Sequence, residues 1–204
     1  VLFCGYPGWS DWYLAANLSE EDALQGHLLP GLDPQGVPKS LLGSAKPFKF
    51  NDVEELNGLV EAHGERIAAI VMEPLRNSEP TEEFRNAVHG AKERLGVPLV
   101  IDEITAGFRL NVGGAHLTRG WEPDMAVFGK AISNGHPMAA VIGTRELMEA
   151  AQTTFISSTY WTERSGPAAA LVTIRKMQRI DAPAILDTVG REVRRVWQQA
   201  AQTA

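Results

Sequence analysis

The sequence predicts an α/β protein with a mostly parallel sheet and helices on both faces. Short, continuously apolar runs alternate with helical patterns along the 204 residues. Runs that are apolar at every position are typical of strands covered on both faces. Strand–helix–strand order favours right-handed crossovers between parallel strands. Hydrophobic residues make up 44% of the chain and the net charge is -6, which excludes a disordered protein.

Five apolar runs are the predicted strands. One begins at the first residue and includes Leu2, Phe3 and Cys4. The other four cover residues 67–72, 98–101, 125–128 and 138–143.

The helices are predicted from capping residues and apolar spacing. Thr81 is placed to cap a helix whose apolar residues form one stripe as far as Gly96. Asn51 and Glu54 form a capping-box pattern that opens a helix ending at about His63. Two late helices are predicted, from about Gly166 to Gln178 and from about Pro183 onward. Residues 19–49, which are rich in Gly and Pro, are predicted to form a long loop.

Composition excludes several classes of protein. With 19 Lys+Arg against 25 Asp+Glu, the chain lacks the basic excess of a nucleic-acid-binding surface. Its single cysteine, Cys4, excludes a disulfide framework, and the five scattered histidines show no metal-ligand spacing. No apolar run reaches the roughly 18 residues that span a bilayer. These features favour a cytoplasmic protein with no membrane or nucleic-acid partner.

Both ends of the sequence suggest a fragment. The chain opens on Val1 within an apolar run, and its last residues still follow a helical pattern without a capping glycine. We therefore expect segments of a longer protein on both sides.

Three of the predicted strands end at polar residues. Glu73 follows the run 67–72, Asp102 follows the run 98–101, and Lys130 follows the run 125–128 after one glycine. Taken alone, Asp102 is more simply a loop or capping carboxylate, and Lys130 a solvated surface amine. Ligands of parallel sheets bind beyond the carboxyl ends of the strands. A lysine at the base of such a cleft can have its pKa lowered by desolvation, which makes its amine a nucleophile.

Several blocks of sequence, in a fixed order, resemble the class III aminotransferases, which are pyridoxal-phosphate enzymes of fold type I. The similarity is greatest to the branch of glutamate-1-semialdehyde 2,1-aminomutase. Each block alone is weak, but their order and spacing are specific. The blocks are residues 73–74, 101–104, 107–109, 123–124, 129–137 and 157–159.

The resemblance implies an incomplete fold type I large domain. Residues 1–180 would be the cofactor-binding large domain without its N-terminal part, and 181–204 a connecting helix toward a missing C-terminal small domain. The phosphate-binding turn of the family would lie upstream of Tyr6 and outside the chain. We expect the 204 residues alone to bind the cofactor weakly or not at all, and to be inactive.

The resemblance also implies roles for individual residues. Lys130 would form the Schiff base with the aldehyde of pyridoxal 5'-phosphate and move the proton during transfer. Asp102 would pair with the pyridine nitrogen and keep it protonated, which makes the ring an electron sink. Tyr6, in a block with Gly8, would stack on the cofactor. Thr105 would touch its phenolic oxygen.

Other positions stay open. Where relatives often have a histidine after the stacking aromatic, this chain has Pro7. Glu73 is either an acid near the site or a structural residue. Thr159 or Thr162 would reach the cofactor phosphate of the other subunit, with Thr159 preferred; alternatively, Thr162 or Ser165 caps a helix. Arg85, Arg109 and Arg164 are more simply solvated arginines than ligands of a substrate carboxylate.

The implied function is transfer of an amino group between a small amino donor and an aldehyde or keto acceptor, in a homodimer. Two alternatives remain. One is an aminomutase of the glutamate-1-semialdehyde type, and the other is a catalytically inert truncated homologue.

Overall fold

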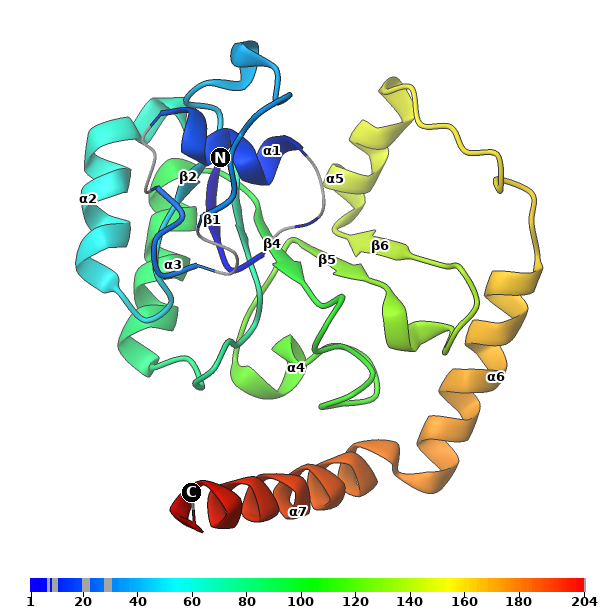
Figure 1. Ribbon diagram of the computed structural model, residues 1–204. Helices are drawn as coiled ribbons and strands as arrows, with labels where there is room; N and C mark the ends of the chain where they lie inside the picture. Colours follow the sequence, from blue (N-terminus) through cyan, green and yellow to red (C-terminus); the bar gives the residue numbers. More distant parts are fainter. Residues whose placement is uncertain (7, 9–10, 20–22, 28–30, 204) are drawn as a thin grey trace.

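A six-stranded sheet forms the centre of the molecule in the computed structural model, which describes residues 1–6, 8, 11–19, 23–27 and 31–203. The strand order is β2-β1-β3-β4-β5-β6 (Figure 1). Every neighbouring pair is parallel except β5 and β6, which are antiparallel. The predicted α/β fold with a mostly parallel sheet is confirmed.

The strands lie at the predicted apolar runs, but several bounds differ and one strand was not predicted. The run 98–101 is shifted by one residue, to Leu99–Asp102, and the run 138–143 is a strand only from Ala140. The run 67–72 is a strand only from Ile70, because the N–H of Ile67 bonds the carbonyl of Gly64 at the end of a helical turn, η3 (Gly64–Arg66). The two-residue β2 lies inside residues 19–49, where only a loop was predicted, and pairs with Leu2 and Phe3. The strands are β1 (Leu2–Cys4), β2 (Lys46–Pro47), β3 (Ile70–Met72), β4 (Leu99–Asp102), β5 (Met125–Phe128) and β6 (Ala140–Gly143).

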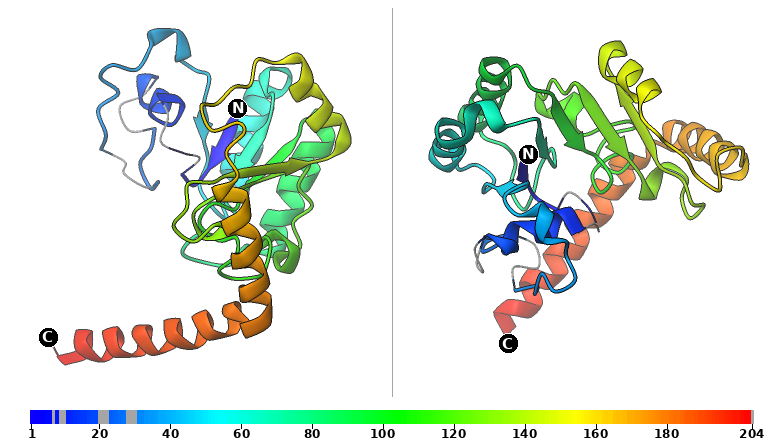
Figure 2. Two further views of the ribbon diagram at one scale, coloured as in Figure 1. Left: turned by 90° about the vertical axis from the view of Figure 1, so that its right-hand side faces the viewer. Right: turned by 90° about the horizontal axis from the view of Figure 1, so that it is seen from above.

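One face of the sheet is covered by α2 (Val53–His63) and α3 (Glu82–Leu95), which lie side by side (Figures 1 and 2). Alternate strand residues point into this layer, where they bury apolar surface against the two helices. The main buried cluster is Leu2, Cys4, Phe48, Leu56, Val60, Ile67, Ile70, Met72, Phe84, Val88, Ala91, Leu99, Ile101 and Trp121.

The opposite face near β1 is covered by α1 (Asp11–Leu14), η1 (Ala15–Leu18) and later residues that include Leu24 and Ala45 (Figure 2). Phe3 points to this side and packs with Tyr13, Ala16 and Leu24. The predicted loop thus forms part of the second layer, with η2 (Lys39–Leu41) and β2 near its end.

The predicted capping box at Asn51 and Glu54 is wrong by one residue. Asp52 caps α2, because its side chain accepts the N–H of Glu55 at 2.9 Å. Asn51 instead takes a left-handed conformation, with φ of 65°, and its side chain accepts the N–H of Thr81 at 3.0 Å. It therefore links the start of α2 to the start of α3.

The predicted ends of α3 are confirmed. The Thr81 hydroxyl accepts the N–H of Phe84 at 3.1 Å, and Gly96 ends the helix with φ of 63°. A glycine suits this position because a side chain is disfavoured at positive φ.

The remaining helices are short, apart from the two at the C-terminal end. Both predicted late helices are confirmed as α6 and α7, each beginning one residue earlier than expected. These elements are η3 (Gly64–Arg66), α4 (His116–Arg119), η4 (Lys130–Ile132), α5 (Arg145–Ala150), η5 (Ala151–Thr153), α6 (Ser165–Ile180) and α7 (Ala182–Thr203).

Helix α7 projects from the rest of the molecule (Figures 1 and 2). Asp181, in a left-handed conformation, ends α6 and changes the direction of the chain. The apolar residues of α7 follow helical spacing on one side and are exposed: Ile185, Leu186, Val189, Val193, Val196 and Trp197. In the described part of the chain, no helix combines the length and the apolar character needed to cross a membrane.

Candidate functional site

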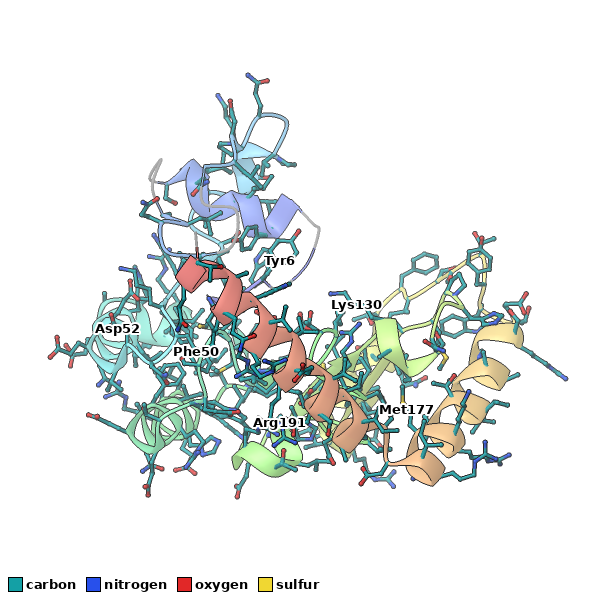
Figure 3. The ribbon with its side chains drawn as sticks, turned by 60° about the horizontal axis from the view of Figure 1, so that its bottom comes forward. Tyr6, Phe50, Asp52, Lys130, Met177 and Arg191 are labelled. Carbon is teal, nitrogen blue, oxygen red and sulfur yellow. The ribbon has the colours of Figure 1, made fainter. Side chains whose placement is uncertain are left out.

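Residues from four strand exits meet in one cavity of about 570 Å³. Tyr6 follows β1, Glu73 follows β3, Asp102 ends β4 and Lys130 follows β5. Gly8 and Thr105 line the same cavity. Figure 3 shows Tyr6 and Lys130 in neighbouring positions. The structure therefore brings together all the predicted site residues except the two threonines after α5.

Lys130 stands at a strained point of the backbone. It follows Gly129 at the end of β5 and has φ of 48°, in the left-handed region. This conformation is unfavourable by about 1 kcal/mol or more for a residue with a side chain. Its Nζ donates a hydrogen bond to Thr105 Oγ1 at 2.9 Å. The turn therefore holds the amine against the residues that follow β4.

Asp102 is a buried carboxylate at the cavity wall. Its side chain accepts the N–H of Ile104 at 2.9 Å, and the residue is 8% exposed. Burial raises its pKa to about 6; Glu73 and Glu103 also raise it, while the Ile104 hydrogen bond and Lys130 lower it. An ionised carboxylate that is poorly solvated favours a cationic partner. The cavity therefore has a carboxylate suited to a protonated ring nitrogen.

Glu73 connects two strand exits. Its carboxylate accepts the backbone N–H of Tyr6 at 3.2 Å and forms an ion pair with Arg76. Gly5, with φ of 95°, has no room for a side chain, because a Cβ would overlap the Glu73 carboxylate. Glu73 thus lies at the cavity and also has a structural role, so both interpretations of it hold geometrically.

The Tyr6 ring packs edge-on against the Tyr13 ring, with 4.7 Å between centroids and 75° between planes. Burial raises the pKa of the Tyr6 phenol, which keeps the hydroxyl protonated. Tyr6 therefore presents a neutral ring at the cavity. Pro7, which replaces the histidine of many relatives, lies outside the described residues.

Sequence reasoning missed Glu103, which is fully buried. Its carboxylate accepts the N–H groups of Ala115 and His116 at 2.9 and 2.7 Å and contacts His116 Nδ1 at 2.8 Å. Gly114 lies so close that a Cβ there would overlap His116. Glu103 thus holds together the two ends of the loop that carries Thr105. Its position directly after Asp102, pointing to the other side of the strand, was the available signal.

Two arginines also line the cavity. Arg76 was not predicted, and Arg109 was expected to be a solvated surface residue. Arg109 is partly exposed, and its Nη1 donates to the Thr105 carbonyl at 2.5 Å. The turn after β4 brings Arg109 back over the site.

Thr159 and Thr162 do not reach this cavity. Both lie in the exposed segment between η5 and α6, at the edge of the molecule in Figure 1. The alternative that Thr162 or Ser165 caps α6 is wrong. The Glu163 carboxylate accepts the Ser165 N–H at 2.7 Å, and this bond lowers the pKa of Glu163.

Comparison with known proteins identifies the family to which the chain belongs. The sequence model described as "Aminotransferase class-III" matches residues 33–202, most of the chain. The chain belongs to the class III aminotransferase family. The predicted resemblance is therefore confirmed.

Curated proteins similar to the chain include a transaminase and an aminomutase. The chain is 34% identical over 194 residues to 2'-deamino-2'-hydroxyneamine transaminase of Streptomyces kanamyceticus, covering 95% of this chain and 45% of that protein. It is 42% identical over 118 residues to glutamate-1-semialdehyde 2,1-aminomutase of Thermus thermophilus, covering 56% of this chain and 27% of that protein. The chain thus spans less than half the length of these relatives.

Solved structures of transaminases share the fold. An omega-transaminase from Sphaerobacter thermophilus superposes with a TM-score of 0.81 at 23% identity, covering all of this chain and 49% of that one. A structure titled "Transaminase with PLP bound" superposes with a TM-score of 0.71 at 22% identity, covering 86% of this chain and 43% of that one. The predicted fold type I architecture is confirmed.

Proposed function

We propose that this chain is the lysine-bearing part of a pyridoxal-phosphate-dependent aminotransferase, which transfers an amino group between a small amino donor and an aldehyde or keto acceptor. The observation that carries the proposal is the cavity shared by Lys130 and Asp102 in a member of the class III family. One residue offers an amine and the other a carboxylate, from adjacent strands of a parallel sheet.

Lys130 is the residue that would bind the cofactor covalently. Its Nζ is accessible from the cavity, and the Thr105 hydroxyl holds it at 2.9 Å. After release from the cofactor, the same amine can hold and move a proton at the substrate carbon. Thr105 would then orient either this amine or the cofactor's phenolic oxygen.

Asp102 fits the ring nitrogen of the cofactor. Pyridoxal phosphate, when bound, supplies an electron sink that depends on a protonated ring nitrogen. Asp102 can accept the hydrogen bond of that N–H with the part of its carboxylate left accessible, and the pair would offset the burial that raises its pKa to about 6. A charge-assisted hydrogen bond of this kind contributes roughly 1.5–3 kcal/mol.

The other predicted residues form the walls of the site. Tyr6 would stack on the cofactor ring, with Gly8 beside it giving close approach without a side chain, because both line the cavity. Glu73 would act near the cofactor through its hold on the Tyr6 backbone.

The remaining parts of the proposal concern the whole protein. A homodimer would let Thr159, or alternatively Thr162, approach the cofactor phosphate of the other subunit; both are exposed here. Residues 1–180 would form the incomplete large domain and 181–204 a connecting helix, consistent with the change of direction at Asp181.

The aminomutase alternative is supported by the 42% identity to glutamate-1-semialdehyde 2,1-aminomutase of Thermus thermophilus over 118 residues. Product analysis separates the two activities. An aminotransferase releases a carbonyl product derived from the donor, whereas an aminomutase returns an isomer of its single substrate. The inert-homologue alternative predicts neither product.

Covalent attachment at Lys130 tests the proposal directly. The full-length gene product that carries this sequence is incubated with pyridoxal phosphate, reduced with borohydride and digested. We expect a mass increase on the peptide containing Lys130, and its loss in Lys130→Ala. Lys39→Ala, which removes an exposed lysine outside the cavity, should label like the wild type. Labelling spread over many lysines, or no labelling of the wild type, would refute the proposal.

A further inference from the structure

Arg76 has no role in the proposed function, yet it lines the same cavity as Lys130 and Asp102. It follows β3, the strand next to the one that ends at Asp102. Its side chain is 22% exposed, so it is neither part of the core nor a freely solvated surface group. A charged residue in this position needs a partner for its partly desolvated guanidinium.

The position of Arg76 is fixed from two sides. Its Nη1 pairs with the Glu73 carboxylate, which is itself held by the backbone N–H of Tyr6. Its backbone N–H donates to the Ser78 carbonyl at 3.3 Å, and the Asn51 side chain donates to the Ser78 hydroxyl at 3.3 Å. A guanidinium held in this way loses little conformational freedom when it binds a further group.

Few groups in the described part of the chain use the hydrogen-bonding capacity of the Arg76 guanidinium. A guanidinium has five N–H donors in a planar fork. Among the described residues, the guanidinium of Arg76 bonds only Glu73, through one nitrogen. By contrast, Arg109 uses its Nη1 to brace the carbonyl of Thr105 in its own turn. Arg76 therefore has donors that can take a second oxyanion.

The charges around the cavity favour an anion as well. Arg76, Arg109 and Lys130 line it against two carboxylates, Glu73 and Asp102. Under the proposed function, Lys130 and Asp102 are engaged by the cofactor. One carboxylate then faces two guanidinium groups, which leaves a net positive charge beside the reacting amine. Guanidinium groups bind carboxylates and other oxyanions in bidentate geometry.

We propose that Arg76, positioned by Glu73, binds the anionic group of the amino donor or acceptor, so that the substrate carries a carboxylate or similar oxyanion. This inference deepens the proposed function and rests on it for the identity of the reacting partner. The specificity-determining residue then comes from the loop after β3, where the sequence predicted Glu73 as a candidate but not Arg76.

Calorimetry with two probes that cannot react measures binding to Arg76 without turnover, and so tests the proposal. The probes are glutarate, a dicarboxylate, and glutaramide, its uncharged diamide. For the full-length protein as purified, we expect glutarate to bind more tightly than glutaramide. Arg76→Gln keeps a donor for Glu73 but removes the charge, and should weaken glutarate binding by roughly 10- to 100-fold. Arg76→Lys should restore part of the affinity, because the charge returns without the fork.

Arg145→Ala is the matched control, since it removes an 89% exposed arginine outside the cavity. It should leave both affinities unchanged. Equal binding of the two probes to the wild type, or wild-type glutarate affinity in Arg76→Gln, would overturn the proposal. Labelling of Lys130 by pyridoxal phosphate and borohydride should persist in Arg76→Gln. If labelling fails already in the wild type, the proposed function fails, while the probe comparison still decides the role of Arg76.

Discussion

At the scale of single residues, the site places ionisable groups where their environment changes their chemistry. Asp102 is buried at a strand end, and burial raises its pKa to about 6. Its neighbour Glu103 is more deeply buried, but three hydrogen-bond contacts from Ala115 and His116 satisfy its carboxylate. The two adjacent acids therefore differ in function. Glu103 stabilises the loop, whereas the carboxylate of Asp102 accepts, among the described residues, only the N–H of Ile104 and is proposed to bind the cofactor.

Asp102→Asn should stabilise the cofactor-free chain at high pH and weaken cofactor binding. The pKa of Asp102 is raised from 3.8 to about 6, so the folded state binds more protons than the unfolded state between these values. Stability therefore falls as pH rises from about 4 to 6. Removing the charge should recover about 1–3 kcal/mol at pH 8, at about 1.4 kcal/mol per pKa unit, and almost none at pH 4.

Urea unfolding of the two proteins at pH 4 and pH 8 measures this difference. Asp187→Asn, which changes an exposed acid in α7, should show no such pH-dependent gain. A gain of equal size at both pH values would mean that relief of the buried charge is not its cause.

At the scale of elements, side chains at helix ends connect the layers as well as satisfying the first N–H groups. Thr81 caps α3, and its own N–H is accepted by Asn51 from the start of α2. The Trp121 indole N–H donates to the Pro74 carbonyl at 2.7 Å, behind the loop that carries Arg76. These bonds tie the helical layer to the strand exits that form the cavity.

Thr81→Ala should lower the free energy of unfolding by about 1 kcal/mol, because the Phe84 N–H loses its acceptor. Chemical denaturation followed by circular dichroism measures the change. Thr144 also stands at the start of a helix, α5, but makes no capping hydrogen bond through its side chain. Thr144→Ala should therefore cost clearly less. Equal losses in the two variants would contradict the assignment of the cap.

At this scale, prediction from sequence succeeded where neighbouring residues decide the structure. It failed where a contact between distant residues decides it. The spacing of apolar residues identified α3, α6 and α7 because helical periodicity is a local property. The cap of α2 was misplaced because Asn51 and Asp52 both suit a cap, and only the contact with Thr81, thirty residues away, commits Asn51 elsewhere. Strand β2 was missed because its partner, β1, lies more than forty residues earlier.

At the scale of the whole molecule, the chain is a packed sheet from which one amphipathic helix extends. The apolar side of α7 is exposed, with Trp197 at 72%. Contiguous apolar surface of this kind drives association in water. By contrast, the apolar side chains between the sheet and helices α2 and α3 are buried. Apolar surface is therefore covered on that side of the molecule and exposed along α7.

The 204-residue chain should self-associate as its concentration rises, which sedimentation velocity can measure. Replacing Val189 and Val196 together by Glu should reduce this association, because both lie on the apolar side of α7 and are exposed. Replacing Gln198 and Gln202 by Glu adds the same two charges on the opposite side of the helix. That control should associate like the wild type. Identical behaviour of the two double variants would show that the apolar side of α7 is not responsible.

The sequence by itself determined the α/β class, the approximate strands, and the placement of Lys130 and Asp102 at strand ends. These features depend on residues that lie close together in the sequence. Only the tertiary structure decided which groups share the cavity with them. Arg76, the contact between Glu73 and Tyr6, and the bonds of Glu103 all join residues whose proximity depends on the path of the chain. Burial and charge pairing are properties of that path, and no single stretch of sequence contains them.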